Sequence, residues 1–184
     1  PEALTVAWSR RLASYKRPDL IISDIERMKK IVNTKDRPLQ ILIAGKAHPR
    51  DTVAVDLLQR INNELSSSMN TELSHKVVVI PDYNWRLAKN MVSGADIWLN
   101  TPFRFEEASG TSGMKACMNG VLQLTTLDGW TDEVDWKDTG FVVDNENPVQ
   151  SLHDNLEFIV SPLFFDKNIE GYNDTWVQMM LNSM

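Results

Sequence analysis

Residues 106–120 read Glu-Glu-Ala-Ser-Gly-Thr-Ser-Gly-Met-Lys-Ala-Cys-Met-Asn-Gly, and they lie between two short apolar runs. The run before them, residues 95–100, and the run after them, residues 121–127, are each predicted to be buried strands. Between the strands we expect a loop of Ser, Thr and Gly that leads into a helix over residues 112–119, which Gly120 ends. A strand, a glycine-rich loop and a helix suit anion binding, because glycine lets the backbone come close to a ligand and the first-turn amides are unpaired donors.

Lys115 lies near the predicted start of this helix. The positive end of the helix dipole, together with any loss of hydration there, would disfavour its charged form. A lysine that loses its proton readily is suited to form a Schiff base with an aldehyde cofactor. A nucleotide P-loop is excluded, because Lys115 does not directly follow Gly113 and Ala116 stands where Ser or Thr is needed. The pattern by itself leaves a plain alternative open, which is a surface loop with a solvated lysine.

Length and composition set limits on the class of protein. The chain has 184 residues, a formal charge of −6 and a hydrophobic content of 42%, which fits one domain over residues 1–184. The negative charge argues against nucleic acid or an anionic membrane as partner, and no apolar run is long enough to span a bilayer. With Cys117 as its single cysteine the chain fits a reducing cytoplasm. Because the chain starts at Pro1 and ends within a helical pattern, we expect it to be part of a larger protein.

Apolar runs alternate with amphipathic segments along the whole chain. Strands are predicted over residues 5–8, 39–45, 76–81, 95–100, 121–127 and 141–143, and helices over residues 20–31, 53–65, 83–91, 112–119, 149–160 and 176–181. Asp82 is the expected cap of the helix over residues 83–91, and Ser161-Pro162 is expected to end the helix over residues 149–160. This alternation predicts an α/β fold, a Rossmann-like, doubly wound parallel sheet with helices on both faces.

Ligands in such folds bind beyond the carboxyl ends of the strands. The basic segment 9–17, the loop 46–51, Tyr83 and the loop 107–115 all follow predicted strands, so we expect them to share one cleft. The basic segment could instead be simply solvated, and Tyr83 could lie against a ring ligand or pack internally. No metal site is predicted, because His48 has no second histidine or cysteine at ligand spacing.

Four motifs, in this order along the chain, resemble the α-glucan phosphorylases (glycogen, starch and maltodextrin phosphorylases), especially their short bacterial and archaeal branch. The motifs are Arg10-Arg11-x-x-x-Tyr15-Lys16-Arg17, Gly45-Lys46-Ala47-His48-Pro49, the segment from Glu107 to Gly120, and Leu127-Asp128-Gly129-Trp130. The resemblance covers almost the whole chain, but only the C-terminal domain of a two-domain glycosyltransferase of the GT-B type. It implies that an N-terminal half, which supplies the opposite wall of the cleft, is missing here and that this fragment alone is inactive.

The resemblance also implies a cofactor and its ligands. Lys115 would carry pyridoxal 5'-phosphate as a covalent imine, and Tyr83 would border the cofactor. The cofactor phosphate would be held by Arg10, Gly110 and Thr111. In this family the cofactor phosphate exchanges a proton with the substrate phosphate, so Lys115 counts among the catalytic residues.

The substrates that the resemblance implies are an α-1,4-glucan and inorganic phosphate, which react reversibly to give glucose 1-phosphate. Arg11 and Lys16 would bind the inorganic phosphate and take part in catalysis, and the glucosyl unit would contact Glu107, Ser109 and Gly110. Departures from many relatives at Ala13, Asn84 and Ser112-Gly113 concern fine substrate contacts and regulation. A homo-oligomer of the full-length protein is left open.

Two other functions are compatible with the residues. One is a sugar-nucleotide-dependent GT-B glycosyltransferase, which has no need for a lysine in the glycine-rich helix, and the other is a non-catalytic module that binds glucan or phosphate. Lys115 separates the phosphorylase from the transferase. All phosphorylase assignments require Arg11 and Lys16 to lie at the same end of the sheet as Lys115.

Overall fold

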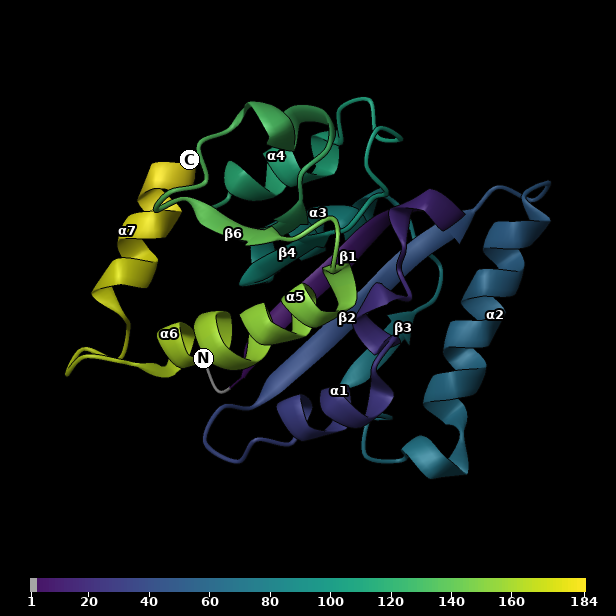
Figure 1. The fold of residues 1–184 in the computed structure, drawn as a ribbon, viewed down its shortest axis with the longest axis horizontal. Helices are drawn as coiled ribbons and strands as arrows, with labels where there is room; N and C mark the ends of the chain where they lie inside the picture. The colour runs from purple at the N-terminus through teal and green to yellow at the C-terminus, as the bar shows by residue number, and fades with distance from the viewer. Residues whose placement is uncertain (1–2) are drawn as a thin grey trace.

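The computed structural model describes residues 3–184, which form an α/β fold around one parallel sheet (Figure 1). In these residues six strands lie in the order β3-β2-β1-β4-β5-β6. The strands are β1 (Leu4–Leu12), β2 (Leu39–Ala47), β3 (Val77–Ile80), β4 (Ile97–Asn100), β5 (Leu122–Thr126) and β6 (Gly140–Val143). Every neighbouring pair is parallel, and the order reverses at β1, which confirms the predicted doubly wound, Rossmann-like class.

The helices of the described chain are α1 (Ile25–Val32), α2 (Thr52–Ser66), α3 (Trp85–Gly94), α4 (Thr111–Cys117), α5 (Pro148–Asp154), α6 (Ser161–Phe165) and α7 (Asp174–Ser183). The helices α1 to α4 connect the first five strands, a 3₁₀ turn lies between β5 and β6, and α5 to α7 follow β6. Short 3₁₀ turns cover Ser14–Lys16, Leu20–Ile22, Ser68–Asn70 and Gly129–Glu133, and a π-helical stretch, Asn155–Val160, joins α5 to α6. No helix within residues 3–184 is both long enough and apolar enough to cross a membrane.

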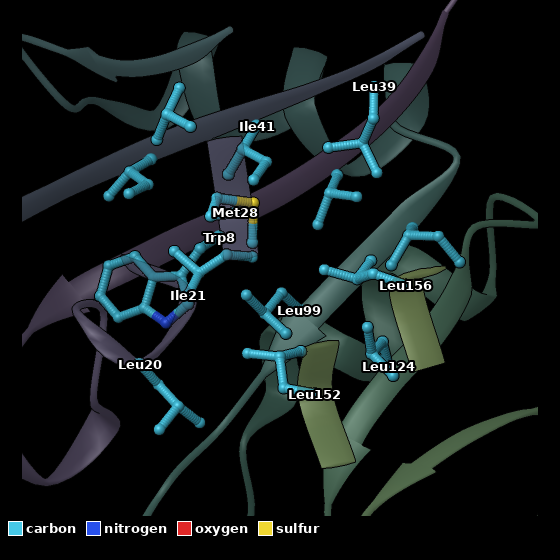
Figure 2. Packing of buried hydrophobic residues seen from close by; sticks show 14 of the residues in the cluster. Trp8, Leu20, Ile21, Met28, Leu39, Ile41, Leu99, Leu124, Leu152 and Leu156 are labelled. Carbon is cyan, nitrogen blue, oxygen red and sulfur yellow. The ribbon is translucent and has the colours of Figure 1, made fainter. Parts of the chain in front are cut away.

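The two faces of the sheet carry separate apolar clusters because side chains alternate along each strand. Val6 and Trp8 of β1 point to the larger cluster, which α1, α2 and α5 cover, and Ala7 points to a smaller cluster beneath α3 and α4. Figure 2 shows part of the larger cluster, where Trp8 and Met28 lie among leucine and isoleucine side chains. All residues of β4 and β5 are buried, as expected for central strands of a sheet covered on both faces.

β1 is longer than the sequence predicted. It was expected over residues 5–8, but it pairs with β2 as far as Leu12, which lies opposite Ala47. The ladder hydrogen bonds carry the strand through Arg10 and Arg11, although charged residues are uncommon in a central strand. These two arginines therefore belong to the end of a strand and not to a loop.

Three helix boundaries also differ from the sequence prediction. The pattern over residues 20–31 is split into a 3₁₀ turn and α1, because the Asp24 side chain accepts a hydrogen bond from Arg27 N at 3.0 Å and starts a new helix. Asp82 does not cap α3; the Asn84 side chain does, accepting from Arg86 N and Leu87 N at 3.0 and 3.1 Å. Pro162 does not end the chain's fifth helical pattern, since it lies in the first turn of α6, where proline's missing N–H is not needed.

Candidate functional site

The strands β1 and β4 separate at their carboxyl ends. They pair only through Val6 with Ile97 and Ala7 with Trp98, after which β1 continues to Leu12 while β4 ends at Asn100. This separation falls at the point where the strand order reverses, which is the usual ligand position in doubly wound sheets. The residues that the sequence singled out lie at this end of the sheet, in the last part of β1, in the loops after β1, β3 and β4, and in α4.

A cavity of about 400 Å³ lies between α3 and α4, over the ends of β1 and β4. Its lining includes Lys115 and Ser112 of α4, Tyr83 of the loop before α3, and Ser9 and Trp98 of the sheet. The structure therefore brings Lys115 and Tyr83 to one cavity, as the sequence predicted. Trp85, 79% exposed, also belongs to this lining.

Two polar atoms in the cavity wall have no protein partner. Ser9 Oγ and Trp98 Nε1 are buried, and neither forms a hydrogen bond within residues 3–184. Buried polar groups are nearly always paired, so a wall that holds two unpaired ones is suited to a polar ligand. Sequence reasoning missed both residues, because a single Ser or Trp in an apolar strand reads as core; the only signal was that Ser9 shares the face of Ala7.

Lys115 does not lie where the sequence placed it within its helix. α4 begins at Thr111, after Gly110 with a φ of 90°, so Lys115 falls in the last turn of the helix and not in the first. Its side chain is exposed in the described chain. The expected loss of hydration is therefore absent from this chain, and Lys115 lies away from the positive end of the helix dipole.

Lys16 and Glu107 form a buried ion pair that joins the loops after β1 and β4. Lys16 Nζ donates to Glu107 Oε2, and each side chain is only 10% exposed. A buried pair of this kind repays its loss of hydration only when its geometry is good. The structure thus brings together one residue predicted to bind phosphate and one predicted to bind a glucosyl unit.

Arg10 and Arg11 point to different surroundings because they are successive residues of a strand. Arg10 is buried, donates to Asn100 Oδ1 and to Leu99 O, and has its guanidinium carbon 5.2 Å from the Trp8 ring centroid. Burial lowers the pKa of Arg10 to about 10, although the Glu107 carboxylate acts in the opposite direction, so Arg10 is charged at neutral pH. Its contacts hold the end of β4, and its assignment to a cofactor phosphate stays a prediction.

Arg11 is exposed and lines a second, shallower pocket of about 360 Å³ with Lys46 and His48. Tyr83 borders this pocket as well as the cavity of Lys115. Arg11 and Lys115 thus lie at the same end of the sheet, on either side of Tyr83, but they do not line one cavity. The assignments required Arg11 and Lys16 to lie at the same end of the sheet as Lys115; Arg11 does so, and Lys16 lies in the turn directly after β1, where it pairs with Glu107.

The glycines of the loop accommodate an indole ring. A Cβ on Gly113 would lie 2.8 Å from Gln123 Oε1 and 3.1 Å from Trp130 Cζ2, and a Cβ on Gly110 would lie 3.6 Å from Trp130 Cδ1. Trp130 in turn lies 5.6 Å from Trp136, measured between ring centroids. The Trp130 ring therefore packs against Gly110 and Gly113, and a side chain at position 113 would not leave room for it. Thr111, the first residue of α4, is exposed.

Comparison with known proteins agrees with the resemblance found in the sequence. A family model described as carbohydrate phosphorylase matches residues 1–140. The chain is 43% identical over 187 residues to a glycogen phosphorylase of Aquifex aeolicus, which covers 97% of this chain and 27% of that protein. It is 40% identical over 193 residues to a maltodextrin phosphorylase of Thermococcus litoralis, which covers 99% of this chain and 22% of that protein. The chain thus spans about a quarter of the length of these curated relatives.

Proposed function

Because this chain belongs to the carbohydrate phosphorylase family, we propose that it is the C-terminal, cofactor-binding domain of an α-1,4-glucan phosphorylase. The observation that carries the proposal is the cavity that Lys115 lines at the carboxyl ends of β1 and β4. A second domain, N-terminal to this one in a GT-B arrangement, would form the opposite wall of the cleft. The parent enzyme would work in the cytoplasm, and this chain alone would be inactive.

The residues of the cavity fit pyridoxal 5'-phosphate. Lys115 supplies an accessible amine for the covalent link, and Tyr83 supplies a ring beside it. The same wall also holds Ser9 Oγ and Trp98 Nε1, two buried polar atoms that have no hydrogen-bond partner in the described residues. When bound, the cofactor would supply a phosphate group that exchanges a proton with the substrate phosphate.

Residues of the loops after β1 and β4 would hold the substrates. Glu107, fixed by Lys16, presents carboxylate oxygens that accept hydrogen bonds from the hydroxyl groups of a glucosyl unit. Ser109 and Gly110 follow it in the same loop and would contact the same unit. Lys16 and Arg11 supply positive charge for inorganic phosphate, and Arg11 can bind a phosphate with two parallel hydrogen bonds. Positive side chains close to a departing phosphate stabilise the negative charge that develops on it, and this lowers the barrier to glucosyl transfer.

The decisive experiment uses the full-length parent protein. Borohydride reduction followed by peptide mapping should find the cofactor on Lys115, and Lys115→Ala should lower phosphate-dependent release of glucose 1-phosphate by at least about 1,000-fold. Lys30→Ala, an exposed lysine of α1, is the matched control and should leave the rate unchanged. Modification of another lysine, or full turnover by Lys115→Ala, would refute the proposal.

A further inference from the structure

The loop after β4 is held by a carboxylate from the loop after β5. Asp128 Oδ1 accepts a hydrogen bond from Phe105 N at 2.9 Å, and Asp128 Oδ2 accepts from Glu106 N at 3.1 Å and from Glu107 N at 2.6 Å. Asp128 is 3% exposed, so its charge is almost fully removed from water. Three successive backbone N–H groups are thus fixed by one buried anion, and the last of them belongs to Glu107.

The residues that follow Asp128 add two more restraints on the same loop. Gly129 has a φ of 60°, and a Cβ there would lie 2.6 Å from Ser109 O and 2.9 Å from Glu107 O. Trp130 N donates to Ser109 O at 3.1 Å. Residues 128–130 therefore contact the backbone on both sides of Ala108, and their contacts require a glycine at the centre of the segment.

The charge of Asp128 has no cation partner in the described part of the chain. Within residues 3–184 it forms no ion pair. Asp128 also forms a capping box with Thr131, in which the Asp128 side chain accepts from Thr131 N–H and Asp128 N–H donates to Thr131 Oγ1 at 2.9 Å, and Thr131 Oγ1 donates to Asp128 O at 2.9 Å. A carboxylate without a cation is costly to bury, and here the three N–H donors compensate for the lost hydration. An amide at this position would turn an NH₂ group toward a backbone N–H and would leave at least one of the donors unpaired.

We propose that Asp128 is a positioning residue for Glu107. Asp128 fixes the backbone of Glu107, Lys16 fixes its carboxylate, and the side chain between these two points is thereby held in one orientation toward the substrate. This inference rests on the proposed function, in which Glu107 contacts the glucosyl unit. Asp128 does not line the cavity of Lys115, so it acts on the glucosyl subsite and not on attachment of the cofactor.

The first test compares two variants of the full-length protein. Asp128→Asn should lower kcat/KM for glucose 1-phosphate, measured with a glucan acceptor, by about 30-fold. Cofactor content, measured by absorbance, should stay at the level of the unmodified protein. Asp132→Asn, a more exposed aspartate of the same segment that pairs with Arg104, is the matched control and should change kcat/KM less than twofold.

A double-mutant cycle with Glu107→Gln separates this inference from the proposed function. If Asp128 acts through Glu107, Asp128→Asn should have less than about a threefold effect on kcat/KM once Glu107→Gln is present. A full 30-fold effect in that background would overturn the positioning role while leaving the proposed function intact. If Glu107→Gln alone leaves kcat/KM unchanged, the proposed role of Glu107 is itself wrong.

Hydrogen exchange provides a second readout, and its measurement on the unmodified protein does not depend on the Asp128 variant folding. In the unmodified protein and in Glu107→Gln, the amide hydrogens of residues 105–107 should be protected, although this segment lies in a loop. In Asp128→Asn these three amides should exchange faster while the amides of β4 stay protected. Rapid exchange of residues 105–107 in the unmodified protein would overturn the inference.

Discussion

On one face of the sheet, α1, α2 and α5 cover a continuous apolar cluster that contains Trp8, Met28 and Ile41. On the other face, α3 and α4 cover a small cluster around Met91 and Trp98, and beside it lies the cavity of Lys115. The cavity wall includes the unpaired Ser9 Oγ and Trp98 Nε1, whereas on the face of the larger cluster α5 carries His153 Nε2, also buried and without a hydrogen-bond partner in the described residues.

This difference shows how one sheet can combine stability with a binding site. Burial of apolar area supplies most of the folding free energy, and it is concentrated on the face away from the cavity. The site face can therefore keep polar atoms without partners and side chains such as Lys115 exposed. Buried polar atoms without a hydrogen-bond partner lower the stability of the fold, and they are typical of ligand-binding sites.

The largest expected effect is on stability and uses the same chemical change on each face. Met28 is 0% exposed in the larger cluster, and Met91 is 5% exposed in the smaller one. Met28→Ala should lower the free energy of unfolding by about 3 to 4 kcal/mol, and Met91→Ala by about 2 kcal/mol, because the smaller cluster adjoins an open cavity. Urea unfolding of the chain measures both, and equal losses would show that the two faces contribute alike.

A smaller effect of opposite sign is expected for the unpaired hydroxyl. Ser9→Ala removes a buried group without a partner in the described chain, so it should raise the free energy of unfolding by about 1 kcal/mol. In the full-length protein the same change should weaken cofactor retention. Thr126→Val is the matched control, because Thr126 Oγ1 donates to Pro102 O at 3.0 Å and its removal should destabilise the chain. A loss of stability in Ser9→Ala would mean that the hydroxyl has a partner after all.

The smallest effect concerns pH and Cys117 of α4. Burial raises the pKa of Cys117 from 9.0 to about 11, and a hydrogen bond with Gln123 acts in the opposite direction. Between these values the unfolded chain loses the thiol proton and the folded chain keeps it, so this contribution to stability is complete below pH 9 and is lost as the pH rises through 11. The free energy of unfolding should therefore fall less from pH 8 to pH 10.5 in Cys117→Ala than in the unmodified chain. Equal falls in both proteins would contradict the raised pKa.

The sequence identified the elements around the site because their signals are local. The apolar runs of β2 and β4 and the Ser, Thr and Gly loop before α4 follow from side-chain pattern and backbone preference. Lys115 and Tyr83 were predicted near one cleft because both follow strands of one parallel sheet, and they do line one cavity.

The orientations of Arg10 and Arg11 could not be predicted from the local sequence. As a basic loop, both arginines were expected to face the ligand, but pairing with β2 extends β1 through them, and strand alternation then sends Arg10 into the protein and Arg11 to the surface. The role of Asp128 was equally hidden, because its partners, residues 105–107, are more than twenty positions away. A residue's hydrogen-bond partner across such a distance depends on which strands become neighbours.

By itself, the sequence determined the alternation of strands and helices, the glycine-rich loop and the presence of Lys115 in the helix that follows. These features depend on side-chain periodicity and on backbone conformations allowed over a few residues. Only the tertiary structure decided that Lys16 pairs with Glu107, that Asp128 holds the loop that contains Glu107, and that Ser9 and Trp98 line a cavity. Those contacts arise when β1, β4 and β5 become neighbours in the sheet, and no stretch of the chain encodes that arrangement alone.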